Sequence, residues 1–219
     1  MKLEAKKVTF SYPGRKKIPV LEQVDFQLAS GERIGLKAPS GTGKTTLCRL
    51  LAGYEIPDQG AVLLDGKALK TYKGVCPVQM VWQHPDLAVD SLQRLGSTMQ
   101  ETGGLEDRMK KALYIQDDWM ERFPSELSGG ELQRFCLARA LHPETRILLC
   151  DEISAMLDPV SQAQIWQFLL DEAKRRDLGL LVISHDERLL DRVCEKIVEW
   201  TPLAGDKMTG IKKGKSKEK

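Results

Sequence analysis

The sequence predicts an α/β protein: a mainly parallel sheet with helices on its faces, an N-terminal antiparallel β subdomain and an inserted helical subdomain. Short apolar runs alternate with amphipathic helical segments, which is typical of parallel strands buried on both faces. Residues 3–10 and 20–28 instead alternate apolar and polar positions, as antiparallel strands do. From about residue 84 a polar, helix-forming stretch interrupts the strands and indicates the helical insert.

Each element is predicted by a local pattern. Leucines at helical spacing predict a helix that follows a glycine-rich loop and ends near Gly53. Asp65-Gly66 is a hairpin turn signal, and Ser128 is a suitable N-cap for a later helix. The expected elements are strands at 3–10, 20–28, 34–36, 60–64 and 78–82, a helical insert at about 84–143, and strands at 147–150 and 180–183 with a helix between them.

The composition excludes several classes of protein. With 219 residues, of which 42% are hydrophobic and 29% charged, the chain is typical of a globular domain. No run of about 18 apolar residues exists, so no membrane span is expected, and the N-terminal residues predict no secretory signal. The five cysteines are odd in number and form no CxxC pair, which favours reduced thiols over disulfides or zinc.

The positive charge is concentrated at the C-terminus. Residues 207–219 contain six lysines and one acidic residue, whereas the net charge of the whole chain is only +2. We therefore expect residues 1–206 to form the folded domain and residues 207–219 a disordered Lys-rich tail. Contact of this tail with anionic lipid or RNA is the alternative, but overall electrostatics gives no reason to expect nucleic acid as a partner.

The strongest chemical signal is a glycine-rich loop between a strand and a helix. Binding a phosphate requires converging backbone N–H groups, a helix N-terminus, a lysine, and a hydroxyl for Mg²⁺. Gly41, Gly43, Lys44 and Thr45 fill these roles, and Ala38 occupies a position that is usually glycine, which requires that Ala38 have a negative φ. The residues expected to bind the phosphates are Ser40, Gly41, Thr42, Gly43, Lys44, Thr45 and Thr46.

Two adjacent carboxylates follow a buried strand. A carboxylate at such a position is costly unless it holds a metal or a hydrogen-bond network. Asp151 suits water-mediated coordination of Mg²⁺, and Glu152 suits the general base that polarises an attacking water. Because adjacent side chains on a strand point to opposite sides, the two carboxylates can take different roles.

A second glycine-containing motif opens a helix far along the chain. Ser128 is its N-cap, and Gly129 and Gly130 leave the helix N-terminus open to an anion. The segment Leu127-Ser128-Gly129-Gly130-Glu131-Leu132-Gln133-Arg134 resembles the signature motif of ABC-type ATPases. The resemblance implies a P-loop NTPase (RecA-like) core, with ATP and Mg²⁺ bound, and it implies that this motif closes over the ATP held by a partner subunit.

Smaller matches occur in the order the family shows. The resemblance implies that Tyr12 stacks on adenine, and that Gln83 senses Mg²⁺ and the attacking water. Asp158 falls in the loop that lies between subunits, and His185 matches the histidine that hydrogen-bonds the γ-phosphate. The expected metal ligands are therefore Thr45, Gln83 and Asp151, and the expected catalytic residues are Glu152, His185 and Gln83.

Within the family, the chain is similar to ATP-binding subunits of the peptide/nickel importer group. The similarity is carried by residues 78–83, 127–141 and 151–165. It implies a second ATPase subunit, identical or homologous, two transmembrane permease subunits, a substrate-binding protein, and a peripheral position on the cytoplasmic face of the cell membrane. That group commonly has a longer C-terminal extension than the 34 residues that follow His185 here.

Several alternatives remain open from the sequence. The subunit could serve an ABC transporter for another cargo or in the export direction, or it could be a soluble ABC ATPase that is not linked to transport. A small-molecule kinase would leave residues 127–134 without a purpose. A non-hydrolysing regulatory module would not need Glu152.

Overall fold

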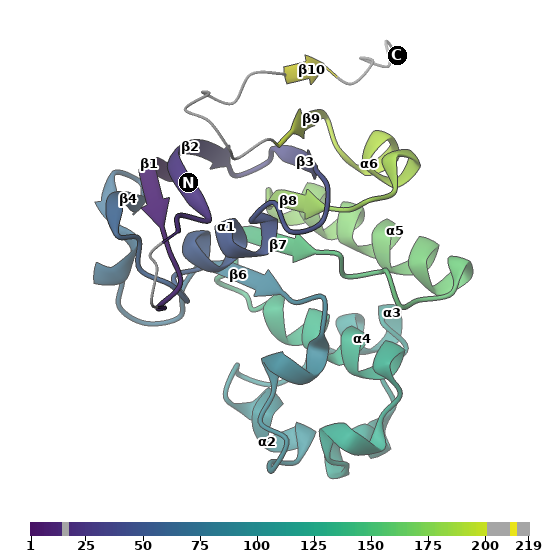
Figure 1. Ribbon diagram of the computed structural model, residues 1–219. Coiled ribbons are helices and arrows are strands. Elements are labelled where there is room, and N and C mark those ends of the chain that lie inside the picture. Colours follow the sequence, from purple (N-terminus) through teal and green to yellow (C-terminus); the bar gives the residue numbers. More distant parts are fainter. Residues whose placement is uncertain (15–17, 201–210, 214–219) are drawn as a thin grey trace.

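The computed structural model describes residues 1–14, 18–200 and 211–213 (Figure 1). Within these ranges the strands form two sheets. The antiparallel sheet has the order β2-β1-β4-β5 and comprises β1 (Lys2–Phe10), β2 (Leu21–Ala29), β4 (Gln59–Leu64) and β5 (Lys67–Ala68). The mainly parallel sheet has the order β10-β9-β3-β8-β7-β6 and comprises β3 (Arg33–Lys37), β6 (Val78–Val81), β7 (Ile147–Asp151), β8 (Gly179–Ile183), β9 (Lys196–Glu199) and β10 (Ile211–Lys213).

Helices cover both faces of the parallel sheet. Helix α1 (Lys44–Leu51) lies between this sheet and the antiparallel one, whereas α5 (Pro159–Arg176) covers the opposite face (Figure 1). Helix α6 (Glu187–Val193) connects β8 to β9. The helical insert follows β6 and contains α2 (Leu95–Gln100), α3 (Asp107–Ala112) and α4 (Gly129–Ala140), with short 3₁₀ turns at Pro85–Ala88, Asp117–Glu121 and Pro124–Glu126; a further 3₁₀ turn, Leu69–Thr71, follows β5.

The strands of the parallel sheet are apolar on both faces because each face has its own core. Leu148 and Cys150 of β7 belong to the cluster that α4 and α5 complete, and Leu149 belongs to the cluster shared with α1 and the antiparallel sheet. Every residue of β7 and β8 is buried. The helical insert contributes Trp119 and Phe135 to the first of these clusters, so it shares a core with the sheet.

The predicted elements agree closely with the observed ones. The hairpin at Asp65 and Gly66 forms with φ values of 49° and 78°, as a tight turn of this kind requires. Helix α1 ends before Gly53, which has a φ of 80°. The strand predicted at 78–82 ends one residue earlier, at Val81. Of the predicted Lys-rich tail, only 211–213 lies in the described residues, where its backbone pairs with β9 as β10.

No helix in the described part of the chain is long and apolar enough to cross a bilayer.

Candidate active site

The phosphate loop runs from β3 to α1 with a backbone that requires glycine. Gly43, the residue before α1, has a φ of 83°, and a Cβ built there would lie 2.9 Å from Leu21 Cδ2. Gly41 has a φ of 77°, which also lies in the left-handed region that favours glycine. Ala38 is not among the positive-φ residues, so the condition for alanine at that position is met.

Lys44 is held inside the loop by backbone carbonyls. Its Nζ donates hydrogen bonds to the carbonyl oxygens of Ala38 at 2.7 Å and Pro39 at 2.8 Å. The side chain is buried, and burial lowers the pKa of the ammonium group. The loop therefore presents a positive charge that its own carbonyls solvate, and a bound polyphosphate would compete with those carbonyls for the lysine.

Asp151 ends β7 as a buried carboxylate beside the start of α1. Burial raises its pKa, and a hydrogen bond from the Thr45 hydroxyl opposes that rise. A buried carboxylate next to a hydroxyl is a set of hard oxygen donors, which suits Mg²⁺. The described residues contain no group of three or more His, Cys, Asp or Glu that could hold a metal by themselves.

Glu152 lies between two polar side chains from other strand ends. Its Oε1 is 2.8 Å from Nε2 of His185, and its Oε2 accepts a hydrogen bond of 3.1 Å from Nε2 of Gln83. The residue has a φ of 50°, and its N–H donates to the carbonyl of Ile183. We expected strand alternation to separate the two carboxylates, but Glu152 lies after the strand, and its left-handed backbone turns it toward His185.

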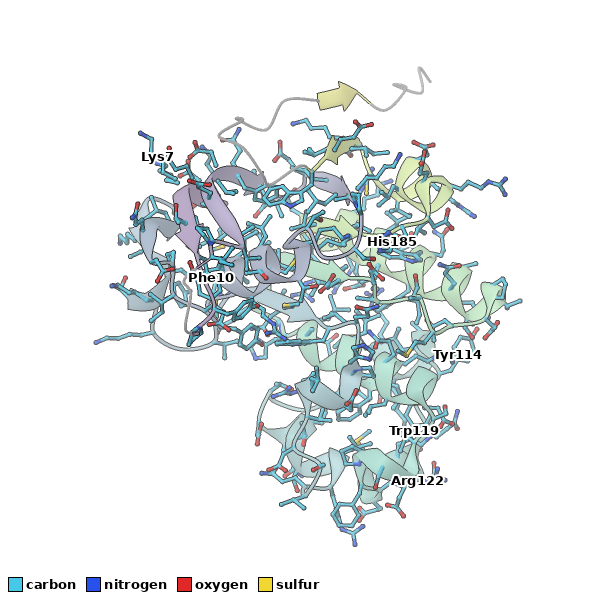
Figure 2. All side chains as sticks on the ribbon, viewed as in Figure 1. Lys7, Phe10, Tyr114, Trp119, Arg122 and His185 are labelled. Atoms are coloured by element: carbon cyan, nitrogen blue, oxygen red, sulfur yellow. The ribbon has the colours of Figure 1, made fainter. Side chains whose placement is uncertain are left out.

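The three residues converge because parallel strands end at one edge. Gln83 follows β6, Glu152 follows β7 and His185 follows β8, and these strands are neighbours in the sheet. His185 Nε2 also lies 3.5 Å from the hydroxyl of Ser40 in the phosphate loop. Figure 2 labels His185 near the middle of the molecule, above Trp119 and Arg122 of the helical insert. The carboxyl edge of the sheet thus joins the predicted base to the phosphate loop.

The signature motif forms an exposed helix N-terminus. The hydroxyl of Ser128 accepts a hydrogen bond from the N–H of Glu131, and the Glu131 carboxylate accepts one from the N–H of Ser128. Ser128 and Gly129 are exposed. Within the described residues, no hydrogen bond or ion pair joins residues 128–130 to residues 38–46 of the same chain. Ser128 and Gly129 therefore lie at the surface of the chain.

Tyr12 and Asp158 lie at the edges of this region. Tyr12 packs edge-on against Phe10, and its hydroxyl is 3.2 Å from that of Thr46 at the start of α1. Asp158 is the N-cap of α5 and accepts hydrogen bonds from Val160 N–H and Ser161 N–H. These bonds and the Ser161 hydroxyl lower its pKa. Tyr12 thus touches the phosphate-loop helix, and Asp158 caps α5, while its predicted place in the loop between subunits stays a prediction.

The structure adds a residue that the sequence analysis missed. Trp200, at the end of β9, donates its indole N–H to the carbonyl of Thr42 in the phosphate loop at 2.8 Å. The two residues are 158 positions apart, and no local pattern connects them. Gln133 of α4 is a second such residue, because its side-chain amide donates to the carbonyl of Trp82, next to Gln83.

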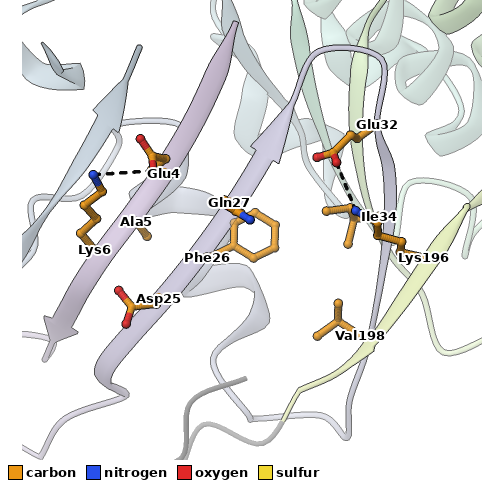
Figure 3. A pocket seen from close by; sticks show the side chains of 10 residues that line it. All are labelled: Glu4, Ala5, Lys6, Asp25, Phe26, Gln27, Glu32, Ile34, Lys196 and Val198. Carbon is orange, nitrogen blue, oxygen red and sulfur yellow. Dashed lines mark hydrogen bonds and ion pairs between the residues drawn. The ribbon is translucent and has the colours of Figure 1, made fainter. Parts of the chain in front are cut away.

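A cavity of about 340 Å³ lies between β2 and β9, away from these motifs (Figure 3). Phe26, Ile34 and Val198 form apolar walls, and an ion pair of 3.2 Å between Glu32 and Lys196 closes one side. None of the residues predicted to bind nucleotide lines it.

The fold and the site together define a P-loop ATPase of the ATP-binding-cassette class. The defining features are the glycine loop between β3 and α1, the acidic pair Asp151-Glu152 at the end of β7, and the exposed start of the signature helix. The model of the family described as "ABC transporter" matches residues 21–155. The chain belongs to this family, and it is an ATPase.

Curated relatives support the assignment. The chain is 33% identical to a nickel import ATP-binding protein, NikE, of Rhodospirillum rubrum, in a match covering 85% of this chain and 76% of the relative. It is 34% identical to the NikE protein of Escherichia coli O6:K15:H31, covering 87% and 80%. A solved structure described as the dimeric form of MJ0796, a bacterial ABC transporter cassette, matches with a TM-score of 0.78 at 22% identity, covering 95% of this chain and 99% of that one. This last match supports the fold.

Proposed function

We propose that the chain is the ATP-hydrolysing subunit of a membrane importer for small peptides or a chelated metal such as nickel. The observation that carries the ATPase part is the convergence of Lys44, Glu152 and His185 at one edge of the parallel sheet. The similarity to nickel import ATP-binding proteins, which extends over most of the chain, supports the importer and its cargo.

In this proposal the chain's own groups bind and orient ATP. Lys44 and the N–H groups at the start of α1 hold the phosphates, and Tyr12 supports the adenine. Thr45, Gln83 and, through water, Asp151 would hold Mg²⁺, which neutralises phosphate charge when it is bound. Such an arrangement requires Lys44 to exchange its bonds to loop carbonyls for bonds to phosphate.

Hydrolysis then depends on Glu152 and its two neighbours. Glu152 accepts a proton from the attacking water as a general base, while Gln83 and His185 fix the orientation of its carboxylate. His185 and Gln83 both contact the Glu152 carboxylate, so its orientation is set from two sides. When ATP is bound, His185 would instead contribute a hydrogen bond to the γ-phosphate.

We further propose that Ser128 and Gly129 of a second subunit close over the γ-phosphate. The exposed position of these residues and the absence of polar contacts with the phosphate loop among the described residues support this arrangement. The hydroxyl of Ser128 accepts from Glu131 N–H, so its own proton is available for an anion.

Two inactive variants can test the shared site. Lys44→Ala destroys the phosphate loop of one subunit, and Ser128→Arg blocks the signature motif of the other. If sites form between subunits, each mixed dimer has one intact site and one site that carries both substitutions. With random pairing about half of the dimers are mixed, so the mixture should regain about a quarter of the wild-type ATPase activity if the sites are independent. If each site forms within one subunit, the mixture stays inactive.

A groove beside the site suits a permease. A space of about 260 Å³ lies between the residues of β6 and helix α4, with Cys76, Met80 and Arg139 among its walls. Leu87 and Leu92, nearby in the insert, are 60% and 85% exposed. We propose that a cytoplasmic segment of a permease subunit binds here, so that the insert around residues 84–100 transmits movement to it.

Transport itself is tested in cells. Deleting the gene should reduce uptake of radioactive nickel or of a labelled dipeptide, and wild-type protein but not a Glu152→Gln variant should restore it. Uptake of both substrates at the wild-type level in the deletion strain would contradict the proposed cargo. Purifying the tagged protein from membranes should also recover transmembrane permease subunits, whereas a soluble ABC ATPase would be recovered without them.

A further inference from the structure

Trp200, directly after β9, donates one hydrogen bond to the phosphate loop and one to the end of β3. Its indole N–H donates to the Thr42 carbonyl at 2.8 Å, and its backbone N–H donates to the Lys37 carbonyl at 2.8 Å. The side chain is only 3% exposed and packs in the core cluster beneath α1. The indole is therefore a fixed donor whose position is set by the sheet.

The Thr42–Gly43 peptide links this donor to the phosphate-binding groups. The carbonyl of Thr42 and the N–H of Gly43 belong to one planar unit, and the described residues contain no cis peptide bond. In a trans unit the two groups point in opposite directions. A donor that holds the Thr42 carbonyl toward the core therefore turns the Gly43 N–H to the other side of the loop.

This peptide needs a constraint because glycine follows it. Gly43 has a φ of 83°, and glycine adopts positive and negative φ about equally readily. Glycine thus permits the orientation observed here without selecting it. Rotation of the peptide by half a turn would direct a carbonyl oxygen at the phosphate and remove one N–H from the cradle.

We propose that Trp200 is a positioning residue of the phosphate loop: its indole N–H selects the peptide orientation in which the Gly43 N–H can bind phosphate. The inference rests on the proposed ATPase function, because ATP supplies the phosphate that the Gly43 N–H would bind. Without the indole donor, only a fraction of molecules has the competent loop at any moment. The apparent dissociation constant for nucleotide then equals the constant of the competent loop divided by that fraction.

The test removes the N–H and keeps the ring. Trp200→Phe preserves an aromatic side chain in the core, and incorporation of benzothienylalanine at position 200 replaces only the indole N–H by sulfur. Trp119→Phe is the matched control, since Trp119 is 4% exposed in the helical insert and far from the loop. For each protein the dissociation constants of Mg-ATP and Mg-ADP, the kcat, the KM and the melting temperature are measured.

Both replacements at position 200 should weaken Mg-ATP and Mg-ADP binding about 3- to 10-fold, in the range of one lost hydrogen bond. KM should rise by the same factor while kcat at saturating ATP stays near the wild-type value, because the competent loop is unchanged once it is occupied. The Trp119→Phe control should keep the wild-type KM even if its melting temperature falls.

The outcomes separate the two levels of the proposal. If benzothienylalanine at position 200 leaves both dissociation constants unchanged in a folded protein, Trp200 is a core residue only and the inference is overturned. If wild-type protein itself fails to bind Mg-ATP, or Lys44→Ala binds it equally well, the proposed function fails first.

Discussion

The carboxylate of Glu152 lies 2.8 Å from Nε2 of His185, and the two residues follow adjacent strands of the parallel sheet. Asp151 at the end of β7 pairs with Ile183 at the end of β8, so register places the residues after each strand side by side. The left-handed backbone of Glu152, with a φ of 50°, turns its carboxylate toward the His185 ring. Sheet geometry thus orients the predicted base.

We predict that Glu152→Gln lowers ATP turnover by about 10²- to 10⁴-fold, because the amide cannot accept a proton from water. ATP binding should persist. Because hydrolysis is slow, a stable ATP-bound dimer should accumulate, and gel filtration detects it. The control is Glu195→Gln. Glu195 is exposed, and its carboxylate forms an ion pair with Arg33 at the start of β3. Wild-type turnover in Glu152→Gln would show that another group is the base.

We predict that His185→Ala lowers kcat by about 10²- to 10³-fold, the range for losing one donor to developing charge in a transition state. The KM for ATP should change much less, since Lys44 and the glycine loop remain. Steady-state kinetics beside a His142→Ala control measures this split, because the ring of His142 accepts a hydrogen bond from the N–H of Glu144 in a local turn and is not one of the predicted ATP-site residues. An equal loss in both variants would assign His185 a structural role.

We predict that Lys44→Ala weakens equilibrium binding of Mg-ATP by roughly 10- to 100-fold, which corresponds to losing charge-assisted hydrogen bonds to phosphate. Isothermal titration with Lys67→Ala as the control measures this, since Lys67 lies exposed on β5. Unchanged affinity would mean that Lys44 only ties the loop through the Ala38 and Pro39 carbonyls.

Two isosteric substitutions should have opposite effects on the free energy of unfolding, and both effects should disappear at low pH. Burial raises the pKa of Asp151, so its ionised form is destabilising without Mg²⁺. Asp151→Asn should therefore stabilise the nucleotide-free protein by about 1 kcal/mol at neutral pH. That gain is fully present above the raised pKa and disappears as the pH falls below the ordinary aspartate value of 3.8.

Asp158→Asn should destabilise the same protein, because the pKa of Asp158 is lowered by hydrogen bonds from Ser161 and from backbone N–H groups at the start of α5. This contribution is present above pH 3.8 and is lost as the pH falls through the lowered pKa. Urea unfolding at several pH values measures both variants. The same sign for both would contradict the assignment of burial at Asp151 and capping at Asp158.

The predicted elements did not include α6 or β9. Most of the other strands and helices, the phosphate loop and the acidic pair could be predicted from local sequence patterns. Each is encoded locally: glycine supplies the positive φ at Gly41 and Gly43, and Ser128 with Glu131 builds a capping box within four residues. The resemblance to a family added Gln83 and His185, which a bare sequence shows only as residues after strands.

Only the tertiary structure decided which distant groups meet. The hydrogen bond from Trp200 to the Thr42 carbonyl spans 158 residues, and it exists because β9 pairs with β3 and thereby brings its end beside the phosphate loop. The same holds for Gln133 and the Trp82 carbonyl, and for the turn of Glu152 toward His185. Sequence patterns report the conformation of neighbours along the chain, whereas strand order and register, set by burial of the whole sheet, fix contacts across it.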